Sequence, residues 1–209
     1  SALSYFYWRT APSSKLLLLA KTGELSKKEA VAKQIDEMIA DPRFERATKS
    51  FVTYWAEVYK IYEANKDSAV YPGFDNSIKQ AMFNESREFF HKLVIEGKSF
   101  GDIFTSSHSY GNQELASFYG ASLNTGKIFF PEGERQGLLG HGSILASASY
   151  PDSPSPVHRG VFFLENFVCR HFPEPPAVIT PEVNTSVTNK ERFSQHSENP
   201  NCSGCHNAI

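Results

Sequence analysis

Three observations predict that this sequence forms an all-α fold. Apolar residues recur at spacings of three and four residues through most of the first half of the chain, as on the buried face of a helix. Helix start and stop signals flank several of these runs. The 209 residues include 17 Phe and 9 Tyr, enough large side chains to line a substantial core. We therefore expect a multi-helix domain followed by a loop-rich helical segment.

The first predicted helix lies near the N-terminus, with helical spacing at Leu3, Phe6 and Tyr7, and the pattern breaks at Pro12. A capping box at 26–29, with Ser as the N-cap and Glu three residues later, predicts the start of the next helix. Asp41-Pro42 ends that helix. Its expected apolar face consists of Ala30, Ile35, Met38 and Ile39.

One long buried helix is predicted over Phe44–Tyr62. A loop follows over Asp67–Asp75, which contains Tyr71-Pro72-Gly73. The next helix is predicted over Ser77–Ile95, with Gly97 just past its end. The buried positions expected in the long helix are Phe51, Tyr54, Trp55, Val58, Tyr59 and Tyr62, and those in the later helix are Ile78, Ala81, Met82, Phe89 and Leu93.

The second half has weaker patterns. Leu115–Tyr119 fits a short helix, 124–126 fits a turn, and Lys127–Phe130 fits one short strand. Helices are predicted over Arg135–Ala148 and Val157–Cys169, on either side of a proline-rich loop.

The C-terminal part begins with an extended, proline-rich stretch over about 173–187. A short helix near 189–196 follows, and Asn199-Pro200 opens a last one. We predict a helical domain over 1–128 and a proline-rich helical segment over 129–209.

Charge and hydropathy exclude two classes of protein. The formal net charge is −2, which excludes a general binder of nucleic acid or of anionic membranes. No apolar run reaches the roughly 18–20 residues of a membrane span. Because the sequence begins without Met and stops within a predicted helix, we expect a piece of a longer polypeptide.

The motif Cys202-Ser203-Gly204-Cys205-His206 has the spacing of a c-type haem attachment site. On one helical turn, Cys202 and Cys205 share a face, so each thiol can add to one haem vinyl group. His206 stays on that face and can ligate the iron as the proximal ligand. About one chain in a thousand of this composition would match by chance.

Three other uses of these cysteines stay open. A zinc site could combine Cys202 and Cys205 with His196 and His206, although adjacent Cys and His side chains rarely reach one tetrahedral ion. A redox dithiol normally has a βαβ context, whereas these surroundings are helical and proline-rich. A structural disulfide or free thiols would need no cofactor.

Two sets of short segments carry a family resemblance. The first set is 3–8, 23–25, 71–75, 81–82, 88–90, 115–116 and 119–120. The second set is 135–139, 155–160, 173–176, His196 and the motif at 202–206. By these segments, which cover nearly the whole chain, the sequence resembles two domain-of-unknown-function families, numbers 1592 and 1588 in that order, of large extracytoplasmic c-type haem proteins from planctomycetes and other bacteria.

This resemblance implies covalent haem c and a periplasmic, outer-surface or secreted location, and it leaves the reaction and the redox partner unassigned. Family members continue past the haem motif with a segment that this sequence lacks, so a distal ligand from that segment cannot be assigned. Within the chain, His196 is the best distal candidate. Met38 and Met82 lie on apolar faces and are expected in the core.

The remaining candidate residues are interpreted as structural. We expect His141 to pack between helices rather than bind a ligand, and His158 with Arg159 to form an ion pair at a helix start rather than meet a haem propionate. Cys169 is expected to be a buried, inert thiol. Glu85 and Glu88, near Arg87 and Lys92, are interpreted as a solvated charged face.

Three functional hypotheses follow. The first is a c-type haem module for electron transfer. The second is a haem-dependent oxidase or peroxidase, which requires an open distal position. The third is a module that binds a polymer or a partner protein through residues 1–190, with the haem or zinc site as an appendage. The sequence does not decide whether the protein is an enzyme.

Overall fold

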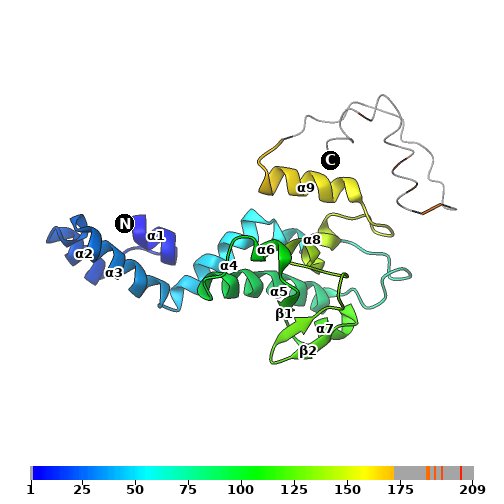
Figure 1. Ribbon diagram of the computed structural model, residues 1–209, viewed down its shortest axis with the longest axis horizontal. Coiled ribbons are helices and arrows are strands. Elements are labelled where there is room, and N and C mark those ends of the chain that lie inside the picture. The colour runs from blue at the N-terminus through cyan, green and yellow to red at the C-terminus, as the bar shows by residue number, and fades with distance from the viewer. Residues whose placement is uncertain (1, 172–186, 189–190, 192–193, 195–202, 204–209) are drawn as a thin grey trace. The chain divides into compact units, whose positions relative to one another are not determined.

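The computed structural model describes residues 2–171, 187–188, 191, 194 and 203 (Figure 1). Two compact units divide the chain, at residues 1–147 and 148–209. The predicted boundary between 128 and 129 remains a prediction. In the described residues, no helix is both long and apolar enough to cross a membrane.

The fold is mostly helical, but it also contains a small antiparallel sheet, so the all-α prediction is only partly right. In chain order the helices are α1 (Ala2–Trp8), α2 (Ser14–Lys21), α3 (Lys28–Ile39), α4 (Arg43–Trp55), α5 (Asn76–Ile95), α6 (Asp102–Thr105), α7 (Gln113–Tyr119), α8 (Gly142–Ser147) and α9 (Pro156–Phe167). The 3-10 turns are η1 (Glu24–Ser26), η2 (Val58–Tyr62) and η3 (Leu138–Gly140), and the strands are β1 (His108–Tyr110), β2 (Ser122–Asn124) and β3 (Lys127–Phe129).

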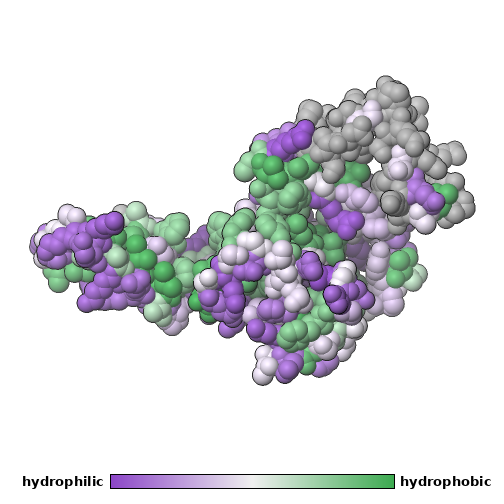
Figure 2. Space-filling view, viewed as in Figure 1, coloured by the Kyte–Doolittle hydropathy of each residue, from purple (hydrophilic) through white to green (hydrophobic). Residues whose placement is uncertain are grey.

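Helix α1 is fixed to α3 and α4 by its last residue. The Trp8 indole Nε1 donates a buried hydrogen bond of 3.0 Å to the carbonyl of Met38, and the Arg43 guanidinium lies 3.4 Å from the centre of the Trp8 ring. Apolar and hydrophilic residues mix on the outer surface of α1–α3 (Figure 2), where Phe6 and Leu18 are exposed. The predicted packing of Met38 in the core is confirmed, because its side chain is fully buried.

The capping box predicted at Ser26 does not form. Gly23, at a φ of 75°, starts the 3-10 turn η1, and Ser26 belongs to that turn. Helix α3 therefore begins one residue later than predicted, with Lys27 as its N-cap and no side-chain cap. The 3-10 turn forms in place of the capping box because both would use the backbone around Ser26. In the turn, for example, the N–H of Lys27 donates to the carbonyl of Glu24.

The predicted long helix over 44–62 is interrupted. Helix α4 ends at Trp55, Glu57 adopts a left-handed conformation with a φ of 48°, and η2 follows. The aromatic residues were also placed on the wrong face, since Phe51 is 54% exposed and Tyr54 is 65% exposed. The buried residues of α4 are instead Phe44, Ala47, Thr48, Val52 and Thr53.

Helix α5 matches the prediction closely because both of its ends carry strong signals. The Asp75 side chain accepts a hydrogen bond of 3.0 Å from the N–H of Ile78 at its start. At its end, Gly97 has a φ of 63° and Lys98 N–H bonds the carbonyl of Leu93, which is a Schellman motif. Helix α4 packs along α5 (Figure 1), where the rings of Phe51 and Phe90 stack at 5.5 Å.

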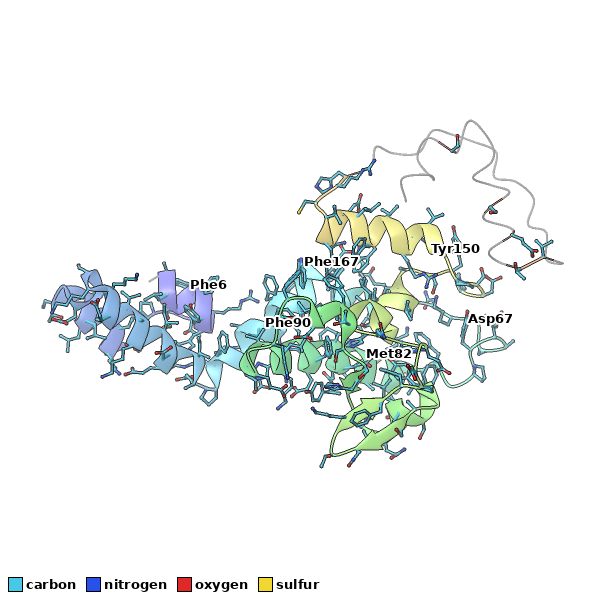
Figure 3. All side chains as sticks on the ribbon, in the orientation of Figure 1. Phe6, Asp67, Met82, Phe90, Tyr150 and Phe167 are labelled. Atoms are coloured by element: carbon cyan, nitrogen blue, oxygen red, sulfur yellow. The ribbon has the colours of Figure 1, made fainter. Side chains whose placement is uncertain are left out.

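The core beside the sheet consists of Ile61, Ile78, Met82, Leu115, Ala116 and Ile128. Met82 therefore has the predicted core position, and it lies on α5 close to the start of α8 (Figure 3). Helix α7 also forms as predicted, with Asn112 as its side-chain cap at 2.9 Å from the N–H of Leu115.

The sheet has the strand order β1-β3-β2, and all its pairings are antiparallel. The predicted strand at 127 and the turn before it are confirmed, whereas β1 and β2 were missed. Thr125 and Gly126 connect β2 to β3 with φ values of 49° and 76°, as in a type I′ hairpin turn. Each strand has only three residues, too few for a two-residue alternation to stand out.

The predicted helix over 135–148 is reduced to η3 and α8, because Gly137 takes a φ of 55° within the segment. Helix α9 forms as predicted, capped by the Ser155 side chain on the N–H of His158 at 3.2 Å. Cys169 corrects another prediction: it follows the end of α9 with a φ of 57° and is exposed, not buried. The extended stretch and the last two predicted helices lie outside the described residues, apart from isolated positions.

Candidate functional site

The predicted haem residues Cys202, Cys205 and His206, and the distal candidate His196, lie outside the described residues. The part of the chain that the structure describes contains no group of three or more His, Cys, Asp and Glu side chains able to hold a metal ion. The haem site therefore rests on the sequence motif. The described part contains a different polar site, in the N-terminal unit.

This second site is a charged cleft of about 760 Å³ between α5 and the β2–β3 turn. Helix α5 supplies one wall with residues spaced at three, four and seven positions, so that they share a face. Segments 110–112 and 125–127 supply the facing wall, and Lys49 is added from α4. The residues that α5 contributes are Ala81, Asn84, Glu85, Arg87, Glu88, Lys92 and Glu96.

Glu85 lines this cleft and corrects the prediction of a solvated face, because it is only 1% exposed. One carboxylate oxygen accepts from the hydroxyl of Ser109 on β1, and the other accepts from the hydroxyl of Tyr119 on α7 at 2.7 Å. Burial raises the pKa of Glu85 to about 7, against the opposing effect of these two donors and of Arg135. Glu85 can therefore exchange a proton near neutral pH.

The sequence did contain a signal for this burial. Ile78, Met82, Glu85 and Phe89 follow one another at spacings of four, three and four residues, so Glu85 lies on the apolar face of α5. A charged side chain within such an apolar stripe is buried together with its neighbours, unless it lies close enough to a helix end to reach solvent. The neighbouring charges had suggested a surface position instead.

Tyr119 connects Glu85 to the segment beyond the sheet. Its hydroxyl oxygen accepts a hydrogen bond of 3.0 Å from the N–H of Gly142, and the Arg135 guanidinium lies 4.3 Å from the centre of its ring. Burial, together with the neighbouring Glu85, raises the pKa of Tyr119 well above its usual value. Tyr119 thus remains a hydrogen-bond donor to Glu85 across the ordinary pH range.

His141 packs in the interior, as predicted, and is 1% exposed. Its Nδ1 lies 2.9 Å from the hydroxyl of Ser86, which lies 2.7 Å from the hydroxyl of Ser143. Burial lowers the pKa of His141 to about 3, and Arg135 adds to the effect. Nε2 is buried and has no hydrogen-bond partner among the described residues. The ring is therefore neutral in the folded protein.

The remaining charges of the cleft are largely paired. Lys49 bonds Glu45 at 2.6 Å and Glu88 at 2.5 Å, and Lys92 lies 3.6 Å from Glu88. Glu88 is therefore a partly exposed, ion-paired residue, as its predicted position near Lys92 suggested. The Tyr110 hydroxyl donates to Glu96 at 3.4 Å, and burial raises the pKa of Tyr110 to about 12.

The predicted ion pair at the start of α9 is not found in the part of the chain that the structure describes. Within the described residues, neither His158 nor Arg159 pairs with a carboxylate. The His158 ring instead lies 5.1 Å from the ring of Tyr150. The start of the helix is stabilised by the Ser155 cap, which needs no charge.

Both halves of the chain match known protein families. Residues 1–121 match the family described as Protein of unknown function (DUF1592), with the short name PSD4. Residues 135–209 match Protein of unknown function (DUF1588), with the short name PSCyt3, which suggests a planctomycete cytochrome-like domain. No curated protein and no solved structure matches the chain. The resemblance inferred from the motifs is confirmed: the chain belongs to the DUF1592 and DUF1588 families.

Proposed function

We propose that this chain is a c-type haem-binding module of a larger extracytoplasmic protein, and that it transfers electrons. The observation that carries the proposal is the motif Cys202-Ser203-Gly204-Cys205-His206. The short name PSCyt3 of the family that includes this motif supports it.

The donor set of the motif fits haem c. Cys202 and Cys205 can each form one thioether with a vinyl group, and the imidazole of His206 is a common proximal ligand of haem iron. When bound, the haem supplies a one-electron couple between ferric and ferrous iron. Cys202 and Cys205 would hold the porphyrin to the chain, His206 would ligate the iron, and His196 is the candidate for a second iron ligand.

The N-terminal unit supports a role as scaffold, because its core does not use the motif. The buried apolar residues of this unit run from Trp8 to Ile144, more than fifty positions before Cys202. Haem attachment and the folding of this unit are therefore separable in our proposal.

The test is to produce the chain with and without haem-maturation machinery in an exporting host. With the maturation machinery, we expect a chain that keeps its haem absorbance after denaturation, because the haem is covalently attached. Without the machinery, we expect no haem absorbance. The double variant Cys202→Ala/Cys205→Ala should lose that absorbance while the far-UV dichroism of the helices changes little. Cys169→Ala is the matched control, since it removes an exposed cysteine outside the motif and should keep the haem.

Other outcomes would favour the alternatives. Zinc held stoichiometrically by Cys202, Cys205 and His206 in the exported protein would replace haem as the cofactor. Rapid binding of carbon monoxide by the reduced haem would indicate an open distal position and favour an oxidase or peroxidase. Binding of the haem-free chain to an insoluble polysaccharide would favour the polymer-binding module.

The proposal also includes the compartment. Thioether attachment of haem takes place outside the cytoplasm, so we expect the natural protein to be periplasmic, surface-exposed or secreted. A gene that encodes no export signal before Ser1 would contradict this.

A further inference from the structure

The charged cleft beside α5 has the size and lining of a site for a polar ligand. Its volume of about 760 Å³ lies within the range of small-molecule sites. Its lining mixes apolar surface, such as Ala81 and the ring of Tyr110, with the charged side chains of Lys49, Lys92 and Lys127. An apolar ligand would desolvate these charged groups without compensation, so the lining favours a polar one.

The charge balance of the lining favours an anion. Glu88 is neutralised by Lys49 and approached by Lys92, and Glu96 accepts the Tyr110 hydroxyl. Arg87 and Lys127 are then left without a carboxylate partner among the residues that the structure describes. The Arg87 guanidinium lies 4.8 Å from the ring centre of Phe83, and the Lys127 amine lies 5.5 Å from that of Tyr110.

Arg87 carries the stronger indication of the two. Its Nε is shielded from solvent and finds no hydrogen-bond partner in the described part of the chain. The two terminal Nη groups of Arg87 also lack a hydrogen bond to the described residues, and a ligand in the cleft would meet the guanidinium through them rather than through the shielded Nε. A planar carboxylate is the acceptor that a guanidinium binds with two parallel hydrogen bonds.

Neutral groups of the same cleft are suited to hydroxyls. Asn84 and Asn112 use their side-chain oxygens within the protein, as acceptors from Gln80 and from the N–H of Leu115. Among the described residues their amide NH2 groups have no acceptor, and the Thr125 hydroxyl of the β2–β3 turn, which donates to the side chain of Asn124, can still accept a hydrogen bond. A backbone cradle for phosphate is not built here, because the N–H of Gly111 already bonds the carbonyl of Gly126.

We propose that this cleft binds a small hydroxy-carboxylate, with Arg87 and Lys127 recognising the carboxylate and Asn84, Asn112 and Thr125 the hydroxyls. The site is independent of the haem motif, so it can be tested on the chain without haem. A failure here would leave the haem proposal unchanged.

The experiment is isothermal titration calorimetry on the full chain with three matched probes. Glucuronate, glucose and glucose 6-phosphate share one hydroxylated ring and differ at one carbon, which carries a carboxylate, a neutral hydroxyl or a phosphate. Succinate and citrate extend the carboxylates to other shapes. We expect at least one carboxylate to bind, glucose not to bind, and glucose 6-phosphate to bind more weakly than the carboxylates.

The variants Arg87→Gln and Lys127→Gln should each weaken carboxylate binding about tenfold or more, the loss expected for one charge-assisted hydrogen bond. Lys15→Gln is the control: it removes a lysine of α2 that is outside the cleft and should leave affinity unchanged. If thermal denaturation shows that Arg87→Gln does not fold, Lys127→Gln on the hairpin decides alone.

Three results would overturn the proposal. The first is that none of the carboxylates binds. The second is that a carboxylate binds with equal affinity to the native chain and to every folded variant of Arg87 and Lys127. The third is that glucose 6-phosphate binds more tightly than all the carboxylates, which would assign the cleft to phosphate.

Discussion

Replacing Glu85 with Gln should change how the stability of the N-terminal unit depends on pH. Burial raises the pKa of this carboxyl from its usual 4.5 to about 7. Between these two values the folded protein holds a proton that the unfolded chain has lost, so the free energy of unfolding falls as the pH rises. At about 1.4 kcal/mol per pKa unit, about 3 kcal/mol is lost by pH 7. Gln mimics the protonated acid at every pH and removes this loss.

His141 makes the free energy of unfolding depend on pH in the opposite direction. Burial lowers its pKa from 6.5 to about 3, so the unfolded chain gains a proton below pH 6.5 that the folded protein does not take up. Stability therefore falls as the pH falls through this window. Between pH 4.5 and 6.5 the two contributions cancel in the native chain. In Glu85→Gln only the histidine contribution remains, and the free energy of unfolding should rise by about 1.4 kcal/mol per pH unit.

The assay is urea unfolding at half-unit steps from pH 4.5 to 7.5, followed by the fluorescence of Trp8 and Trp55. The quantity to compare is the free energy of unfolding of Glu85→Gln minus that of the native chain, since other titrating groups cancel in this difference. Glu132→Gln, which makes the same substitution at an exposed carboxylate of the loop after β3, is the matched control. A difference for Glu85→Gln that stays constant over the whole range would refute the buried, proton-holding carboxyl.

Two further predictions concern the described backbone and core. Gly137→Ala should lower the free energy of unfolding by about 2 kcal/mol or more, because its φ is 55° and a Cβ there would overlap the backbone of α6. In the same urea titration Gly101→Ala, whose Cβ would make only an ordinary contact with the Ser99 side chain, should change it by less than about 1 kcal/mol. Trp8→Phe should lower the free energy of unfolding by about 1–3 kcal/mol, because the buried carbonyl of Met38 loses its hydrogen-bond donor. An unchanged midpoint of thermal unfolding would contradict this.

The helices that the sequence predicted well are those with signals at both ends. Helix α5 has an Asp cap and a following Gly, and α9 has a Ser cap with Pro in its first turn, so local chemistry alone fixes their ends. The predictions for the start of α3 and for an unbroken α4 were wrong, because backbone turns at Gly23 and Glu57 determine where these helices begin and end. A Glu in the left-handed conformation has no sequence signature. The strands were missed because tertiary pairing, not a repeated pattern, defines segments this short.

The polar site around Glu85 could not be predicted from the sequence for a different reason. The haem motif is visible because its residues are neighbours in the chain. The partners of Glu85 are separated from it by 24 and 34 positions, so no local pattern brings them together. The spacing along α5 could have indicated that Glu85 is buried, but not that Ser109 and Tyr119 would meet its two oxygens.

The buried polar stripe of α5 has a consequence for the order in which the chain folds. Glu85 and Ser86 obtain their partners from β1, α7 and α8, at sequence separations of 24 to 57 residues. A chain in which only α4 and α5 have met leaves these groups in water, because nothing local can replace their hydration. Closing the long loops is slow relative to helix formation, so desolvation of α5 must wait for the sheet and α8 to arrive. The middle of this helix should consequently exchange its amide hydrogens only when the sheet, α7 and α8 open together with it.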